Sequence, residues 1–191
     1  MRIAEFYKET FGIEDEEAIC QLAEISRLET LKKGHRVISI GEKMDILPIL
    51  VKGVLRGYVI DEGGRDITDC FIYRKGDVIM GAGDLMSPSP VHIETTTECQ
   101  VLILPLAELM KMLDKPELLL IYNRQLVHAL HRHWQLKMLL YQSDAMTRYQ
   151  WFRKTYSGLE ELISGKHLAS FMGMTPVTLS RLRRKLREEN R

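Results

Sequence analysis

Apolar and polar residues alternate with two different periods along the 191 residues of the chain. Between Phe6 and Ile25 the apolar positions recur at helical spacing behind an acidic run at residues 14–17. Because acidic residues stabilise a helix N-terminus, two short helices are expected here. From Leu28 to Leu104, short β-branched runs are separated by glycine-containing turns. This spacing predicts an antiparallel barrel or sandwich, with Pro48 at an edge or a bulge.

A second helical region begins after Pro105, and Pro116 suits the first turn of its main helix. The helical pattern continues to about Ser143, which gives roughly 40 Å of helix, more than a small barrel needs for cover. A helix of this length usually pairs with a partner helix. We therefore expect a homodimer interface here, with packing against the barrel as the alternative. The expected interface is an apolar stripe of Val127, Leu130, Trp134, Met138 and Tyr141.

The last segment has the pattern of a helix-turn-helix. A first helix from about residue 165 to residue 172 is followed by Gly173, which can adopt the left-handed backbone that a tight turn requires. Thr175 can cap a second helix, and Pro176 then occupies the first helical position, where its missing N–H costs nothing. The buried stripe of this second helix is Leu179, Leu182 and Leu186.

The opposite side of the second helix presents hydroxyl, methyl and guanidinium groups, which can bind base edges and phosphates in the major groove of DNA. Arg181 is the candidate for base readout, because a guanidinium can bond bidentately to guanine, and Val177 and Thr178 can contact neighbouring base edges. The other candidates suit backbone phosphates, which orient a protein without specifying sequence. They are Lys166, Ser170, Thr175, Ser180, Arg184 and Lys185.

The net charge of +1 hides an asymmetry between the two parts of the chain. Residues 146–191 contain ten lysines and arginines against four glutamates, a net charge of +6, which leaves −5 for residues 1–145. A segregated basic segment is typical of a surface that binds a polyanion, so double-stranded DNA is the expected partner. A solvated, basic helix end is the structural alternative.

Several other classes of protein are excluded by composition and pattern. No apolar run approaches the roughly 20 residues of a membrane span, and the acidic N-terminal segment does not look like a secretory signal, so a cytoplasmic location without membrane contact is expected. The three cysteines are widely spaced and are expected to be reduced: Cys20, Cys70 and Cys99.

Histidines and carboxylates in the chain lack the spacing of a catalytic or metal site. His128 and His131 share a helix face, but no carboxylate or cysteine completes a metal site, so no metal is expected. No nucleophile–base pair emerges in the strand region, so the chain is not expected to be an enzyme. The residues considered for such a rival function are His35, Glu42, His92 and Glu94. A small-molecule-sensing barrel whose C-terminal helices bind a protein partner instead of DNA is the alternative.

Nearly the whole chain resembles the Crp/Fnr family of transcription regulators. The most specific part is HLASFMGMTPVTLSRLRRKL, which is similar to the family's helix-turn-helix, and GYVIDEGGRDITDCFIYRKGDVIMG is similar to a strand-turn-strand of its cyclic-nucleotide-binding barrel. The resemblance implies an α+β protein with a double-stranded β-helix of jelly-roll type at residues 1–115, which would act as the sensor. A dimerisation helix would occupy residues 116–145, and a winged-helix-like helix-turn-helix would occupy residues 146–191. The second helix lies close to Arg191, so the chain is expected to depart from many relatives by an absent or reduced wing. The resemblance further implies a homodimer on a roughly palindromic operator, with RNA polymerase as a candidate partner.

The chain departs from this family at the site for the cyclic phosphate. The family's nucleotide binders place a glutamate after the barrel glycine and later an arginine against the phosphate. Here Gly81 is followed by Ala82, and residues 87–91 contain no arginine. A buried phosphate without a paired cation is costly, so cyclic AMP is not expected to bind, and whether another effector exists stays open.

The candidate effector pocket consists of Gly81, Ala82, Ser89 and Val91. No cofactor is expected, because the chain lacks the cysteine cluster of the family's iron–sulfur members. Haem binding through His92 or another histidine stays open as an alternative.

Overall fold

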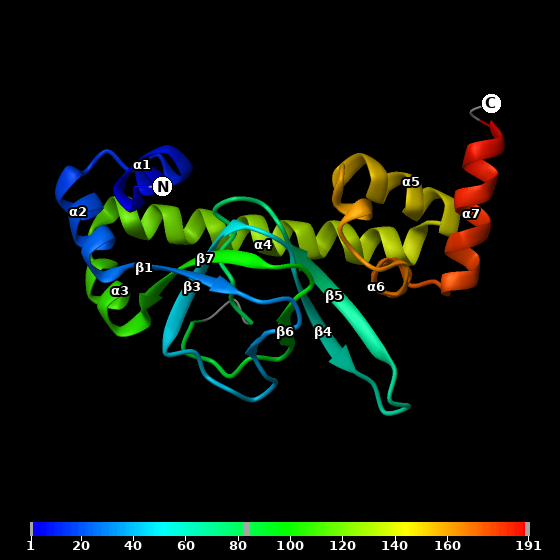
Figure 1. Cartoon of the computed structure of the whole chain (residues 1–191), viewed down its shortest axis with the longest axis horizontal. Coiled ribbons are helices and arrows are strands. Elements are labelled where there is room, and N and C mark those ends of the chain that lie inside the picture. Colours follow the sequence, from blue (N-terminus) through cyan, green and yellow to red (C-terminus); the bar gives the residue numbers. More distant parts are fainter. Residues whose placement is uncertain (1, 82–84, 190–191) are drawn as a thin grey trace.

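The computed structural model describes residues 2–81 and 85–189. One long helix spans the molecule, with the N-terminal helices at one end, the C-terminal helices at the other and the β-strands along one side (Figure 1). In chain order the helices and strands are α1 (Ile3–Phe11), α2 (Glu16–Ile25), β1 (Arg27–Leu31), β2 (Arg36–Ile38), β3 (Ile46–Lys52), β4 (Leu55–Ile60), β5 (Asp66–Ile72), β6 (His92–Thr95), β7 (Cys99–Pro105), α3 (Leu106–Met112), α4 (Pro116–Gln142), α5 (Ala145–Thr155), the 3₁₀ helix η1 (Leu159–Glu161), α6 (Gly165–Phe171) and α7 (Pro176–Glu189).

The strands form two antiparallel sheets, with the orders β1-β7-β3 and β2-β6-β4-β5. Pro48 lies in β3, at the edge of the first sheet, as predicted, and this position suits a residue that lacks an N–H donor. The core of the barrel is apolar and closed, because Leu50, Leu55, Ile93 and Val101 are fully buried. The predicted barrel is therefore confirmed.

The two N-terminal helices pack on the barrel beside α3. At the start of α2, the Asp15 carboxylate accepts hydrogen bonds from the backbone N–H of Glu17 and Ala18, at 2.9 and 3.1 Å. Asp15 belongs to the acidic run that was expected at the start of this helix, and its carboxylate also caps α2. The Glu117 carboxylate, in the first turn of α4, accepts the backbone N–H of Glu14 at 2.8 Å. The start of the long helix is thereby tied to the segment between α1 and α2.

Helix α4 has 27 residues and begins at Pro116, as its sequence predicted. Its buried residues Leu118 and Leu136 belong to two different cores, one at each end of the molecule. No helix in the described part of the chain is long and apolar enough to cross a membrane.

The C-terminal domain has its own core, in which Phe152, Leu168 and Met172 are almost completely buried. This core extends into the barrel, because Phe71 of β5 packs edge-on against Phe171 of α6 with ring centroids 5.0 Å apart. The two domains therefore share apolar contacts and are not joined by α4 alone. No strand occurs between residues 145 and 189. The α+β fold class is confirmed.

Candidate nucleic-acid interface

The turn between α6 and α7 is built by the residues that the sequence singled out. The Ser164 hydroxyl caps α6 by accepting the His167 N–H at 3.1 Å. Gly173 has a φ of 60°, the left-handed conformation that an L side chain rarely adopts. The Thr175 hydroxyl accepts the Thr178 N–H at 3.1 Å and caps α7, which begins at Pro176. The two caps fix the starts of α6 and α7, and Gly173 makes the turn between the two helices.

Helix α7 buries one side and exposes a basic one. Leu179 and Leu186 are buried and Leu182 is half-buried, as its apolar stripe predicted. Seven of the nine candidate DNA-binding residues are exposed: Lys166, Thr175, Val177, Ser180, Arg181, Arg184 and Lys185. Thr178 is half-buried, and its hydroxyl lies 2.9 Å from that of Thr175.

Two of the exposed cations have acidic neighbours one helical turn away. Arg184 lies 3.9 Å from Glu188, and Lys185 lies 3.9 Å from Glu189. All four side chains are at least half-exposed to solvent, and exposed pairs of this kind contribute little stability. Arg184 and Lys185 could therefore leave these ion pairs and bind DNA phosphates at little cost in free energy.

Ser170 differs from the other candidates, because its hydroxyl faces the barrel. It accepts the backbone N–H of Thr68 at 2.9 Å and donates to the carbonyl of Asp66 at 3.1 Å, both in strand β5. Strand β5 is an edge of its sheet, and unpaired edge groups need a partner. In this conformation α6 covers that edge. The phosphate contact expected of Ser170 stays a prediction.

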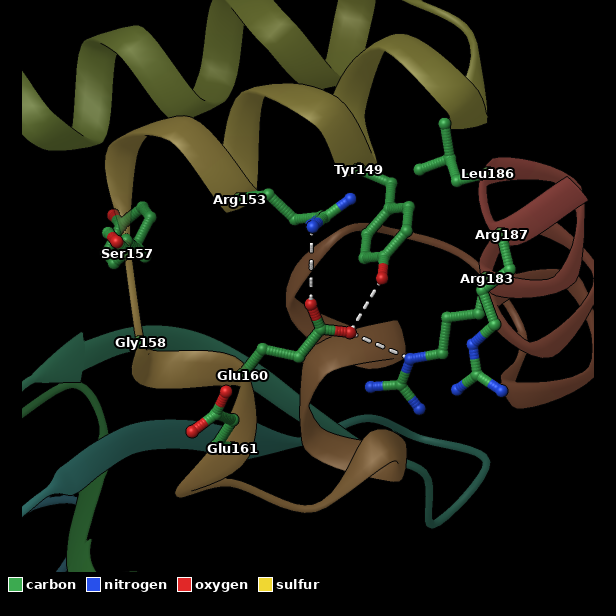
Figure 2. A pocket seen from close by; sticks show the side chains of 10 residues that line it. Tyr149, Arg153, Ser157, Gly158, Glu160, Glu161, Arg183, Leu186 and Arg187 are labelled. Carbon is green, nitrogen blue, oxygen red and sulfur yellow. Dashed lines mark hydrogen bonds and ion pairs between the residues drawn. The ribbon is translucent and has the colours of Figure 1, made fainter. Parts of the chain in front are cut away.

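A cluster around Glu160 holds α7 against α5 and η1 (Figure 2). The Glu160 carboxylate accepts hydrogen bonds from the Arg183 guanidinium at 2.8 Å and from the Tyr149 hydroxyl at 2.7 Å, and Arg153 lies 3.8 Å away. Burial and the bond to Glu160 raise the pKa of Tyr149. Sequence reasoning missed this cluster. The available signal was the position of Arg183, four residues after Leu179 and three before Leu186, on the border of the buried stripe.

The candidate effector pocket is nearly filled by its own side chains. A Cβ placed on Gly81 would lie 1.8 Å from the Ser89 hydroxyl oxygen, so these two predicted residues are in close contact. The cavity that they line has a volume of about 10 Å³. Val91 is half-buried and packs against the barrel core, and Ala82 lies outside the described residues. The described lining of this cavity contains no arginine or lysine to pair with a phosphate.

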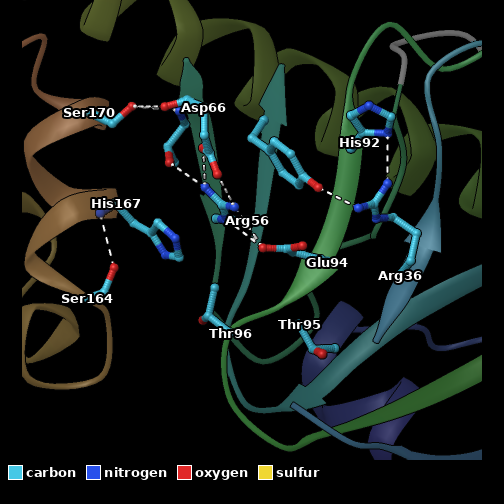
Figure 3. A network of polar contacts seen from close by, with 12 residues as sticks. Arg36, Arg56, Asp66, His92, Glu94, Thr95, Thr96, Ser164, His167 and Ser170 are labelled. Atoms are coloured by element: carbon cyan, nitrogen blue, oxygen red, sulfur yellow. Dashed lines mark hydrogen bonds and ion pairs between the residues drawn. The ribbon is translucent and has the colours of Figure 1, made fainter. Parts of the chain in front are cut away.

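Glu94 and His92, which were considered for a rival enzyme or sensor function, have structural partners. Glu94 binds Arg56, which is 3% exposed and also forms a bidentate pair with Asp66 at 2.6 and 2.7 Å (Figure 3). His92 Nδ1 accepts hydrogen bonds from the Arg36 guanidinium at 3.1 Å and from a backbone N–H.

The other two residues considered for that rival function lie apart from this network. The Glu42 carboxylate accepts the backbone N–H of Ser39 at 2.7 Å, and His35 is exposed. Across the described residues, no group of three histidines, cysteines or carboxylates is arranged to hold a metal ion.

The predicted dimer stripe on α4 is largely exposed. Val127, Leu130, Trp134 and Tyr141 are between 53% and 74% exposed, and Met138 is half-buried. Leu120, 68% exposed, extends the stripe by seven residues toward the start of α4. Such a row of apolar residues on one helix is unusual for a surface that stays in water.

Comparison with known protein families identifies the barrel. Residues 28–115 match the family model of the cyclic nucleotide-binding domain. A search among curated proteins found no match.

Several solved structures have this fold, and some of them are described as regulators. FixK2 from Bradyrhizobium japonicum is similar over 87% of this chain and 86% of its own, with 18% identity and a TM-score of 0.77. CLP from Xanthomonas campestris, a regulator described as responsive to c-di-GMP, is similar over 92% and 93%, with 17% identity and a TM-score of 0.72. A regulator assigned to the Crp/Fnr family, from Eubacterium rectale, is similar over 97% and 88%, with 15% identity and a TM-score of 0.72. These similarities confirm the predicted resemblance at the level of the fold.

Proposed function

We propose that this chain, which carries a cyclic nucleotide-binding domain and has the fold of the Crp/Fnr regulators, is a sequence-specific DNA-binding transcription regulator. The observation that supports this function is the exposed cationic side of α7, which follows a tight turn and a capped N-terminus. Helices presented in this way enter the major groove of DNA in helix-turn-helix proteins.

The residues of α7 divide into two roles. Arg181 is exposed near the middle of the helix and can bond bidentately to a guanine, and the exposed Val177 can contact a thymine methyl group. Lys166, Arg184 and Lys185 surround this centre with positive charge that suits phosphates. Arg183 is bound to Glu160 and does not face the cationic side of α7. The proposed role of Arg183 is therefore to position α7.

We propose that the active form is a homodimer formed along α4. The exposed residues Leu120, Val127, Trp134 and Tyr141 are spaced by seven, the repeat of two packed helices. Pairing two α4 helices would hide this apolar row and place two copies of α7 on one duplex. A two-fold dimer of this kind suits a roughly palindromic operator.

The barrel is proposed not to bind cyclic AMP. Its cavity of about 10 Å³ beside Gly81 and Ser89 has the size of a single water molecule. Calorimetric titration with cyclic AMP should therefore give no saturable heat at this site.

DNA binding is tested by fluorescence anisotropy with a labelled random-sequence duplex at increasing salt. The affinity should fall steeply, with a slope of about 0.9 per phosphate contact in the logarithmic plot. Absence of binding even at low salt would contradict the proposal and favour a protein partner for α6 and α7.

Sequence specificity is tested with the operator obtained by selecting bound fragments of genomic DNA. Arg181→Ala should weaken operator binding by about 1–3 kcal/mol and relax the preference at one base position. Lys33→Ala, an exposed charge on a barrel turn, is the matched control and should bind as the parent chain does. An equal loss on every sequence would make Arg181 a phosphate contact.

A further inference from the structure

A second cavity lies where the three parts of the chain meet. Its volume is about 240 Å³, and it is lined by Arg74 from the segment after β5, by residues of α4 and by residues of α5 and its C-cap. The lining residues are Arg74, His128, His131, Arg132, Gln135, Trp151, Thr155 and Tyr156. None of these residues was assigned to DNA binding, to the dimer stripe or to the barrel pocket.

The polar part of this cavity suits an anion. Two arginines and two histidines converge on it, and among the described lining residues there is no carboxylate. The carboxylate of Asp77 lies 3.9 Å from the Arg132 guanidinium, a distance longer than a hydrogen bond. Asp77 also accepts the backbone N–H groups of Tyr73 and Arg74, so its charge is shared with the turn. The cavity thus retains an excess of positive charge.

The apolar part of the cavity suits a flat ring. The half-buried Trp151 lies edge-on to the buried Tyr156, with ring centroids 5.6 Å apart. Planar ligands stack on such aromatic groups, and arginine guanidinium planes can stack on the ligand as well. The Gln135 amide, 2.8 Å from His131 Nε2, adds a donor and an acceptor that can bind the polar edge of a base.

We propose that this cavity binds a nucleoside monophosphate, with the phosphate between Arg74 and Arg132 and the base against Trp151. Forked guanidinium donors bind phosphate bidentately, which favours a phosphate over a less charged ligand. The cavity volume of about 240 Å³ lies just below the roughly 300–1,000 Å³ of most small-molecule sites. A cavity of this size suits a single nucleotide better than a dinucleotide. This site shares no lining residue with the small cavity beside Gly81 and Ser89.

The position of the site gives it a regulatory consequence. A bound nucleotide would contact the barrel, α4 and α5 at once, and His131 borders the dimer stripe between Val127 and Trp134. Binding would thereby favour the arrangement of the C-terminal domain that is seen here. This consequence rests on the proposed DNA-binding function, whereas nucleotide binding itself does not.

Binding is tested on the full chain by calorimetric titration with 5′-AMP, 5′-GMP, adenosine and inorganic phosphate. At least one nucleotide should bind saturably, and adenosine and phosphate should each bind at least tenfold more weakly. Arg132→Gln and Arg74→Gln should each lower the nucleotide affinity at least tenfold, while Lys33→Gln should leave it unchanged. Thermal unfolding verifies that the variants fold.

The site is located with tryptophan fluorescence, since the chain has two tryptophans. Quenching by the nucleotide should persist in Trp134→Phe and disappear in Trp151→Phe. The proposal is wrong if neither nucleotide binds at millimolar concentration, if adenosine binds as tightly as 5′-AMP, or if both arginine variants bind like the parent. DNA affinity is measured in a separate titration, so failure of either activity is distinguished from failure of the other.

Discussion

Replacement of Ser170 by alanine separates two roles that one hydroxyl could have. The sequence places Ser170 among the phosphate contacts, whereas the structure directs its hydroxyl to Thr68 N–H and Asp66 C=O on the edge of β5. Ser170→Ala removes both bonds and adds no bulk. If the structure describes the role of this residue, the change affects the docking of α6 on the barrel and leaves the DNA-binding side of α7 intact.

The size of the effect follows from the burial of the two partners. Thr68 is 3% exposed, so its N–H loses its partner with little access to water, at a cost of about 1–3 kcal/mol. Asp66 is more exposed, and its carbonyl can bind water instead, which adds little. We therefore expect the free energy of unfolding to fall by about 1–3 kcal/mol in urea titrations followed by circular dichroism. The rate of hydrogen exchange at the Thr68 amide should rise as the stability falls.

Ser180→Ala is the matched control, because Ser180 is exposed on α7 and belongs to the same group of candidates. It should leave stability within about 0.5 kcal/mol of the parent and weaken DNA binding slightly. Ser170→Ala should bind duplex DNA at least as tightly as the parent chain. Unchanged stability together with weaker DNA binding would refute the docking role and restore the phosphate contact.

Three further changes test other parts of the structure. Trp134→Asp should convert a dimer into a monomer in sedimentation equilibrium, because a carboxylate in the stripe is costly to bury; an unchanged mass would place the dimer interface elsewhere. Arg56→Met should lower the free energy of unfolding by about 3–5 kcal/mol, because Asp66 and Glu94 lose their partner in a mostly buried site; a loss below about 1 kcal/mol would contradict this. The hydrogen bonds from Arg56 lower the pKa of Asp66 in the folded chain. The ionised Asp66 carboxylate therefore stabilises the fold fully above the pKa of the unfolded chain, which is near 3.9. This stabilisation is lost as the pH falls through the lower pKa of the folded chain. In Asp66→Asn, stability should therefore fall less steeply below about pH 4 than in the parent, and an equally steep fall would show that other carboxylates dominate.

The helix-turn-helix was predictable because its determinants are local. Gly173, Thr175 and Pro176 act on their own backbone or on residues within one turn, so their effect does not depend on the rest of the molecule. The length and start of α4 were predictable for the same reason, because their determinants are also local. The network of Arg56 was not predictable, because its partners Asp66 and Glu94 come from two other strands that a period alone cannot align.

Periodicity in the sequence also indicated which faces would be buried and exposed, and with them the cationic side of α7 and the apolar stripe of α4. It could not indicate what covers each face, because that depends on contacts between distant segments. Ser170 bonds to residues that precede it by more than 100 positions, and the cavity beside Trp151 gathers its arginines from two separate elements. Local propensity determined the elements and their amphipathic sides. Only tertiary packing decided that α6 covers the edge of β5, that the barrel is closed and that a basic cavity lies between the domains.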